Sequence, residues 1–279
     1  MVAVRILCYN NLEVEWGNTM KRIVFFDLDN TLYHTKKEMI LPETKKLIKA
    51  LSKAGNFKLG LATGRGPKHL DIIDDFKQYF DFFVFLNGGL AIKQDKIIYE
   101  NPMPIETVER VIEKAKNQRV AVGLVTKDGE YITFYDMEVK QLMRGYDKHA
   151  PVINEHIYLE KKVYQIWVFS DDRALLKSFE DVSKDLVFYY WHHGGVDMVL
   201  KGSNKAIAIE KLLDDEVYDE LITVGDGYND IQMIEMADIG IAMGNSGFDE
   251  LKEKADYTAP NIDDDQLYEF FKSLSIISW

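Results

Sequence analysis

Residues 23–32 read IVFFDLDNTL, a short apolar run that stops at two carboxylates. The apolar run predicts a β-strand buried on both faces. Side chains two apart on a strand point the same way, so Asp27 and Asp29 are expected to reach toward one point. Two acids at one point require a cation or a shared proton. The turn-forming Asn30 and the hydroxyl of Thr31 then place this pair at the carboxyl edge of a sheet, where open α/β folds bind ligands.

The composition is that of a folded, acidic protein. Its 279 residues are enough for two domains, and 47% hydrophobic residues exclude a disordered chain. The net charge of −12, with no block of lysine and arginine, argues against nucleic acid and anionic membranes as partners. Cys8 is the only cysteine, so no intrachain disulfide can form and a cytoplasmic location is expected. No stretch approaches the ~18 apolar residues of a membrane span.

Residues 1–20 are predicted to be an N-terminal extension ahead of the first confident strand. Residues 2–8 are mildly apolar but too short for a secretory signal. They fit an added edge strand and an untethered terminus equally well.

The segment after the acid pair alternates helices with buried strands. Pro42 opens a helix that Gly55 ends, because proline suits a first turn and glycine a stop. Strands at 57–62 and 82–86 flank a helix at 70–80. This βαβαβ pattern predicts a parallel sheet with a Rossmann-like architecture.

From about residue 90 the pattern changes to alternation and hairpin signals, which predicts an α+β cap domain at 89–192. Helices are expected at 105–115 and 171–183, and strands at 120–126, 130–135, 163–169 and 186–190. The α/β pattern resumes near residue 196, so residues 21–88 and 193–279 are expected to form the core. The returning core elements are strands at 196–200, 221–224 and 239–242 and a helix from Ser203.

Three further motifs follow or precede these elements in a way that suits phosphate chemistry. Thr63-Gly64-Arg65 supplies a hydroxyl, a glycine and a helix start directly after a strand, which is a corner ready for phosphate. The segment 225–230 again places acids directly after a buried strand. Lys205 lies in the segment 201–205, at the start of a predicted helix.

These four motifs, in this order, resemble those of the haloacid dehalogenase superfamily, and more closely its Cof-like phosphatases, which carry a large α+β cap. The resemblance covers residues 21–275, and residues 241–245 also fit the family's pattern. Asn30 departs from it, since glycine is usual there. His192 and His193 match no part of the pattern.

A phosphate monoester repels most nucleophiles, so its charge must be neutralised before in-line attack. In this scheme Asp27 attacks phosphorus and forms an aspartyl phosphate. Asp29 protonates the leaving oxygen and later deprotonates the hydrolytic water. Mg²⁺ suits the oxygen ligands of Asp27, Asp29 and Asp226, and in family members the second of these is a backbone carbonyl. Asp230 is expected to orient Lys205 or a metal-bound water.

The predicted site is therefore a Mg²⁺-dependent phosphatase centre. Its expected catalytic residues are Asp27, Asp29, Thr63 and Lys205, its metal residues Asp27, Asp29, Asp226 and Asp230, its phosphate-binding residues Leu28, Thr63, Gly64, Lys205 and Asn229, and its cap hinge Asn87 and Gly88. Other interpretations stay open: Thr63 as a helix N-cap, Lys201 in place of Lys205, and Asn87 as an ordinary turn residue.

The expected substrate is a small phosphorylated metabolite, most simply a sugar phosphate, and the expected assembly a monomer or small homo-oligomer. A phosphomutase would use the same aspartyl phosphate, and a phospho-accepting signalling module would use the same residue types. The latter needs no cap, so the length of the chain argues against it.

Overall fold

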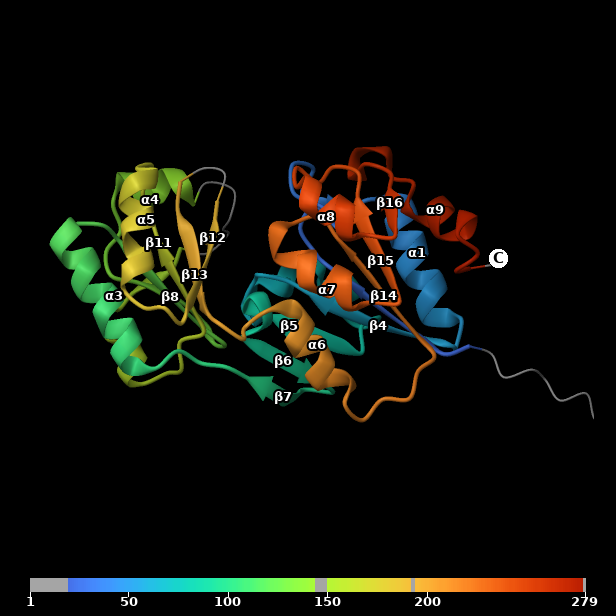
Figure 1. Cartoon of the computed structure of the whole chain (residues 1–279), viewed down its shortest axis with the longest axis horizontal. Helices are drawn as coiled ribbons and strands as arrows, with labels where there is room; N and C mark the ends of the chain where they lie inside the picture. Colours follow the sequence, from blue (N-terminus) through green and yellow to red (C-terminus); the bar gives the residue numbers. More distant parts are fainter. Residues whose placement is uncertain (1–19, 144–149, 192–193, 278–279) are drawn as a thin grey trace, which may run out of the picture.

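The computed structural model describes residues 20–143, 150–191 and 194–277. Two bodies lie side by side, each built on its own sheet (Figure 1). One sheet, the core sheet, has eight strands, and the other, the cap sheet, has six. The predictions for residues 1–19, His192 and His193 fall outside the described residues. Within the described ranges no helix is long and apolar enough to cross a lipid bilayer.

The core sheet confirms the predicted α/β architecture. Strand β1, which the carboxylate pair follows, lies in the middle of this sheet. In the spatial order given next, the strands from β16 to β5 run parallel. In spatial order the strands are β16 (Tyr257–Ala259), β15 (Ile239–Met243), β14 (Glu220–Gly225), β1 (Arg22–Phe26), β4 (Phe57–Ala62), β5 (Phe82–Phe85), β6 (Leu90–Lys93) and β7 (Lys96–Glu100).

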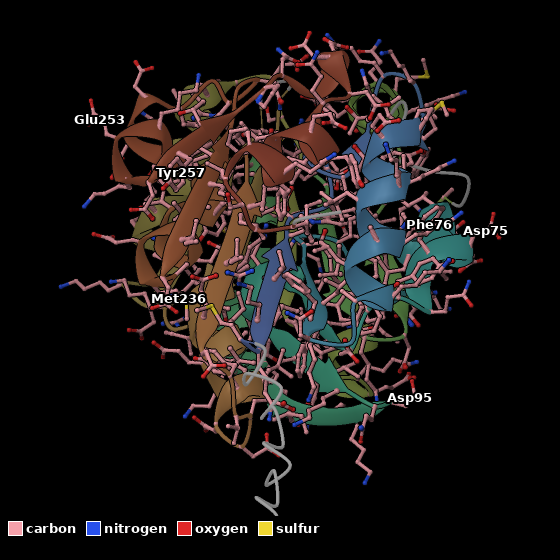
Figure 2. All side chains as sticks on the ribbon, turned by 90° about the vertical axis from the view of Figure 1, so that its right-hand side faces the viewer. Asp75, Phe76, Asp95, Met236, Glu253 and Tyr257 are labelled. Atoms are coloured by element: carbon pink, nitrogen blue, oxygen red, sulfur yellow. The ribbon has the colours of Figure 1, made fainter. Side chains whose placement is uncertain are left out.

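Helices cover both faces of this sheet, which explains why β1 is apolar from Ile23 to Phe26. Val24 and Phe26 pack in one apolar cluster, and Ile23 and Phe25 pack in another on the opposite face. The first face carries α1 (Pro42–Lys53), η1 (Pro67–Ile73), α2 (Asp74–Lys77) and α9 (Leu267–Ser273); the second carries α6 (Lys205–Leu213) and α7 (Ile231–Met236), and α8 (Asp249–Lys254) packs on α7. Phe76 and Met236, labelled in Figure 2, belong to these opposite layers.

Short elements complete the core and shape its loops. They are the hairpin of β2 (Tyr33–His34) and β3 (Met39–Ile40), and the 3₁₀ turns η2 (Leu86–Gly88), η5 (Tyr228–Asp230) and η6 (Ile262–Asp264).

The cap sheet buries one face under its own helices and turns the other toward the core. Trp167, Phe169 and Tyr164 belong to the same apolar cluster as core residues Leu86 and Leu90. The strands, in spatial order, are β10 (Val152–Ile153), β9 (Gly129–Ile132), β8 (Val122–Thr126), β11 (Gln165–Val168), β13 (Val196–Leu200) and β12 (Leu186–Tyr190). The helical elements are α3 (Ile105–Gln118), α4 (Met137–Leu142), η3 (Ile157–Leu159), α5 (Arg173–Ser178) and η4 (Phe179–Asp181).

The predicted domain boundaries are wrong at both ends of the cap. The hairpin β6–β7, expected in the cap, extends the core sheet antiparallel to β5, and β13, expected in the core, pairs with β11 and β12 in the cap sheet. The chain therefore passes between the sheets at 101–104 and 201–204. Alternation and turn residues identify a strand but not the strand it pairs with, and this explains the error.

Gly88, predicted as a hinge, is tightly packed. Its φ is +91°, and a Cβ built there would lie 2.1 Å from the carbonyl oxygen of Asn204. Asn204 caps α6, since its side chain accepts a hydrogen bond from the backbone N–H of Ile207 at 2.8 Å. Glycine at 88 thus allows the turn after β5 to approach the start of the helix that carries Lys205.

Gly88→Ala is expected to destabilise the protein by about 2 kcal/mol or more, because the new methyl group meets backbone and the left-handed conformation is strained. Thermal unfolding should show Tm lowered by roughly 5 °C. Gly247→Ala is the matched control, since nothing lies within 4 Å of a Cβ at Gly247. An unchanged Tm for Gly88→Ala would contradict close packing and favour the hinge.

Candidate active site

The site lies at the carboxyl edge of the core sheet, under the cap. Asp27 follows β1, Thr63 follows β4 and Asp226 follows β14, so three parallel strands deliver their next residues to one edge. A cavity of about 670 Å³ opens there, lined by Asp27, Asp29 and Asp226 from the core and by Tyr189 and Trp191 from the cap.

Asp27 is buried and anchored on one side only. Its backbone N–H donates to the carbonyl oxygen of Val224 at 2.8 Å, and its Oδ1 accepts from Lys205 Nζ at 2.6 Å. Its Oδ2 is buried and forms no hydrogen bond within the described part of the chain. A buried carboxylate oxygen without a partner is costly, so this atom is a candidate for a ligand.

Lys205 lies between two carboxylates and has no exposed side-chain surface. Its Nζ is 2.5 Å from Asp230 Oδ1, and the other oxygen of Asp230 accepts from the backbone N–H groups of Asp226 at 3.0 Å and Gly227 at 2.8 Å. Asp230 therefore orients both the lysine and the 225–230 loop. Lys201, the rival in the sequence, is exposed.

Three carboxylates surround the single lysine of this cluster, and the pKa values of Asp27 and Asp226 are raised. Burial raises the pKa of Asp27 to about 7; Lys205 opposes the rise and Asp230 adds to it. Burial, followed by the charge of Asp27, raises the pKa of Asp226 well above its usual range. Carboxylate oxygens of Asp27, Asp226 and Asp230 lie within 4.8 Å of one another. This cluster is short of positive charge, and a divalent cation would supply it.

Asp29 points away from this cluster, toward Arg65. The guanidinium holds the carboxylate with two bonds of 2.8 Å, from Nε to Oδ2 and from a terminal nitrogen to Oδ1. Such a bidentate pair fixes the orientation of the carboxylate. The side chain of Asp29 is thus absent from the metal-ready cluster, in agreement with the expectation that only its backbone carbonyl serves there.

The turn at 63–65, which was predicted to bind phosphate, lies near backbone N–H groups that have no acceptor in the described ranges. Thr63 is buried and its hydroxyl accepts from the backbone N–H of Arg65 at 3.1 Å, so it does cap this turn. The backbone N–H groups of Leu28 and Gly64 donate to no residue in the described ranges. Free N–H groups beside a lysine suit an anion.

Asn87 joins the core to the cap. Its φ of +53° places it in the left-handed region that asparagine tolerates. Its Nδ2 donates to Gln165 Oε1 of the cap at 3.2 Å, and its Oδ1 accepts from Asn229 Nδ2 of the core at 2.8 Å. Asn87 is therefore more than a turn residue, since it links Asn229 to the cap sheet.

Sequence reasoning gave no role to several residues of the site. Asn245 Nδ2 donates to the carbonyl oxygen of Asn30 at 2.9 Å and so ties two loops of the site together. The φ of Asn30 is +60°, which explains why asparagine replaces the usual glycine. Arg65 was part of the motif Thr63-Gly64-Arg65 but had no role of its own, and Asp197 was a lone acid in an apolar strand; these were the available signals.

The comparisons with known proteins agree with this geometry. A family model described as haloacid dehalogenase-like hydrolase matches residues 24–271. YkrA of Bacillus subtilis, to which a phosphatase activity is ascribed, is 29% identical over 261 residues, 92% of this chain and 98% of that protein. The 5-amino-6-(5-phospho-D-ribitylamino)uracil phosphatase YitU of the same organism is 24% identical over 268 residues, 91% of this chain and 97% of that protein. A solved structure of the HAD subclass IIB sugar phosphatase BT4131 has a TM-score of 0.81 at 25% identity, covering 92% of this chain and 100% of that one.

Proposed function

Because this chain belongs to the haloacid dehalogenase-like hydrolase family, we propose that it hydrolyses a small phosphate monoester with the help of Mg²⁺, through an aspartyl phosphate on Asp27. The chain is a phosphatase, as its relatives are named. The observation that carries the mechanism is the half-anchored carboxylate: Lys205 holds one oxygen of Asp27, while the other is buried without a partner beside the cavity.

The residues around Asp27 supply what the attack on phosphorus requires. Lys205 neutralises charge and fixes the direction of the nucleophile. The free N–H groups of Leu28 and Gly64, with the hydroxyl of Thr63 and the amide of Asn229, are proposed to donate to the phosphoryl oxygens.

Asp29 is proposed to carry the proton. Arg65 orients the carboxylate of Asp29 with two hydrogen bonds, and this carboxylate is proposed to accept a proton from the hydrolytic water. Donation of a proton to the leaving oxygen requires Asp29 to leave Arg65. The pair is thus expected to open and close during each turnover.

The acidic cluster fits a divalent cation. The free Oδ2 of Asp27 and the carboxylate of Asp226 would hold it, together with the backbone carbonyl of Asp29, whereas both oxygens of Asp230 are already engaged by Lys205 and backbone N–H groups. When bound, Mg²⁺ would neutralise negative charge on the phosphoryl group and on the acids.

Chelation is expected to lower phosphate release from p-nitrophenyl phosphate at least 100-fold, and Mg²⁺ to restore it, because the clustered acids otherwise repel the substrate. Mg²⁺ should also raise Tm in the absence of substrate. Asp226→Asn is expected to lose both effects, and Asp249→Asn, an exposed acid of α8, neither. Full activity in chelator, together with a Tm that Mg²⁺ does not change, would contradict the metal site.

The proposed substrate is a sugar phosphate or a similar metabolite. BT4131 is named a sugar phosphatase, and the substrate in the name of YitU carries a phosphorylated ribityl chain. Inorganic phosphate in solution is the expected product; transfer of the phosphoryl group to a second hydroxyl would point to a phosphomutase instead.

A further inference from the structure

The cap carries a carboxylate into the cavity, opposite the core residues described above. Asp197 lies on β13, where its register neighbours are Trp167 on β11 and Tyr189 on β12. It lines the same cavity as Asp27, on a wall that is otherwise mostly aromatic. Placing a single carboxylate among aromatic side chains costs desolvation free energy, and packing of the cap sheet does not require a carboxylate there. Its position therefore suggests a role in binding.

Neutral donors hold Asp197 in place. Its Oδ1 accepts from Trp191 Nε1 at 2.8 Å, and its Oδ2 accepts from Asn87 Nδ2 at 3.5 Å. Burial raises the pKa of Asp197 to about 7, and hydrogen bonds from Trp191, Asn87 and Gln165 oppose the rise. Among the described side chains no lysine or arginine forms an ion pair with it. Each carboxylate oxygen has a second lone pair, so the group can accept further bonds from a ligand.

The hydroxyl of Tyr189 lies on the same face of the cap sheet. Its side chain, next to Asp197 across the strand pair, also lines the cavity. No hydrogen bond joins this hydroxyl to any residue in the described ranges, although burial raises its pKa to about 12. This half-buried phenol is therefore open to a partner in the cavity. The hydroxyl of Tyr189 and the remaining lone pairs of Asp197 thus lie side by side, where a ligand in the cavity can reach them.

Asn87 sets the distance between Asp197 and the reacting phosphate. Its amide bonds to Asp197 at one end and to Asn229 at the other, and its Oδ1 lies 3.0 Å from a Cβ built on Gly64. Asp197 is therefore one amide group away from residues proposed to bind the phosphoryl oxygens. A substrate group that binds Asp197 would therefore lie in the part of the leaving group nearest the phosphate ester.

We infer that Asp197 is a specificity-determining residue that accepts hydrogen bonds from hydroxyl groups on the carbons next to the phosphate ester, with Tyr189 beside it, so that the leaving group is polyhydroxylated. The inference rests on the proposed function and refines it. An apolar leaving group would make no use of the phenol of Tyr189 or of the remaining lone pairs of Asp197. An ammonium group could also pair with the carboxylate, so phosphoethanolamine is included in the test as the alternative.

The test compares esters that differ in hydroxyl groups. Hexose and pentitol phosphates, cyclohexylmethyl phosphate, phosphoethanolamine and p-nitrophenyl phosphate are assayed with wild type and Asp197→Asn. Wild-type kcat/KM for the best hydroxylated ester is expected to exceed that for cyclohexylmethyl phosphate by about 100-fold or more. Asp197→Asn should lower it by about 30-fold on the hydroxylated ester and less than about threefold on p-nitrophenyl phosphate.

Two further variants make the result specific. Asp185→Asn, an exposed cap acid, is the matched control and should change neither rate. Tyr189→Phe removes only a hydroxyl, so it should fold even if Asp197→Asn does not, and it should lower only the rate on the hydroxylated ester, by about fivefold.

Three results would overturn the inference: equal losses on both esters in Asp197→Asn or Tyr189→Phe, a wild-type preference for cyclohexylmethyl phosphate or phosphoethanolamine, or turnover of p-nitrophenyl phosphate without a preferred hydroxylated ester. If wild type releases phosphate from none of the esters, including p-nitrophenyl phosphate, the proposed function itself fails. The two failures are thus distinguishable.

Discussion

Asp27→Asn is expected to lower phosphate release by a factor of about 10⁴ or more while the protein stays folded, because the amide cannot act as the nucleophile. The substitution keeps the shape of the side chain, so Lys205 retains its bond to Asp230 and can still donate to the new amide oxygen. The measurements are phosphate release from p-nitrophenyl phosphate and Tm on the same preparation.

The stability of this variant has a predicted sign. Burial raises the pKa of Asp27 from 3.8 to about 7, so the folded protein binds this proton more tightly than the unfolded chain does. Ionisation of Asp27 therefore costs stability as pH rises from about 4 to 7. In metal-free buffer at pH 8, Asp27→Asn should keep or raise Tm, whereas at pH 5 the difference should be small.

Asp29→Asn is the informative partner variant. It removes the proposed proton carrier and the anion of the Arg65 pair, but leaves the nucleophile intact. We expect it to turn over slowly and to retain phosphate covalently after an acid quench. Asp27→Asn should retain none. Hydrolysis by Asp27→Asn at within tenfold of the wild-type rate would rule out the aspartyl-phosphate mechanism.

The carboxyl-edge site was predictable because its residues follow strands that can be recognised locally. The apolar run before Asp27, and the one before Asp226, identify two buried strands, and parallel strands present their next residues at one edge. Asp27, Lys205, Asp226 and Asp230 accordingly meet as the motifs indicated. Backbone direction accounts for Asp27 and Asp226, whereas Lys205, at the start of α6, and Asp230, at the end of η5, were indicated by the order of the motifs.

The rest depends on contacts between segments far apart in sequence. The pairing of β13 with β11 and β12, and of β6 with β5, is decided by packing that a hydrophobic pattern does not encode. The same holds for Asp197, whose partners Asn87 and Gln165 come from other strands and turns. Arg65 was quoted as part of a motif, but its two bonds to Asp29 required the geometry of both loops.

Lys205→Met is expected to cost both stability and activity. The lysine is buried between Asp27 and Asp230, and its removal leaves two buried carboxylates without a counter-charge. Loss of one partner of a buried ion pair typically costs about 3–5 kcal/mol. Phosphate release should fall by about 10³-fold or more, because the nucleophile loses its anchor and the phosphate its cation. Urea unfolding and phosphate release measure the two effects.

The pH dependence of this loss separates charge from packing. Burial already favours the protonated form of Asp27, and without Lys205 its pKa rises further, so protonation relieves the unpaired charge as pH falls. The destabilisation of Lys205→Met should therefore be large at pH 8.5 and smaller at pH 5.5. Adding Asp230→Asn should restore part of the stability at pH 8.5 but none of the activity. Lys201→Met, an exposed lysine four residues earlier, should change neither quantity. A loss of stability that is equal at both pH values would show that the lysine contributes through packing, not charge.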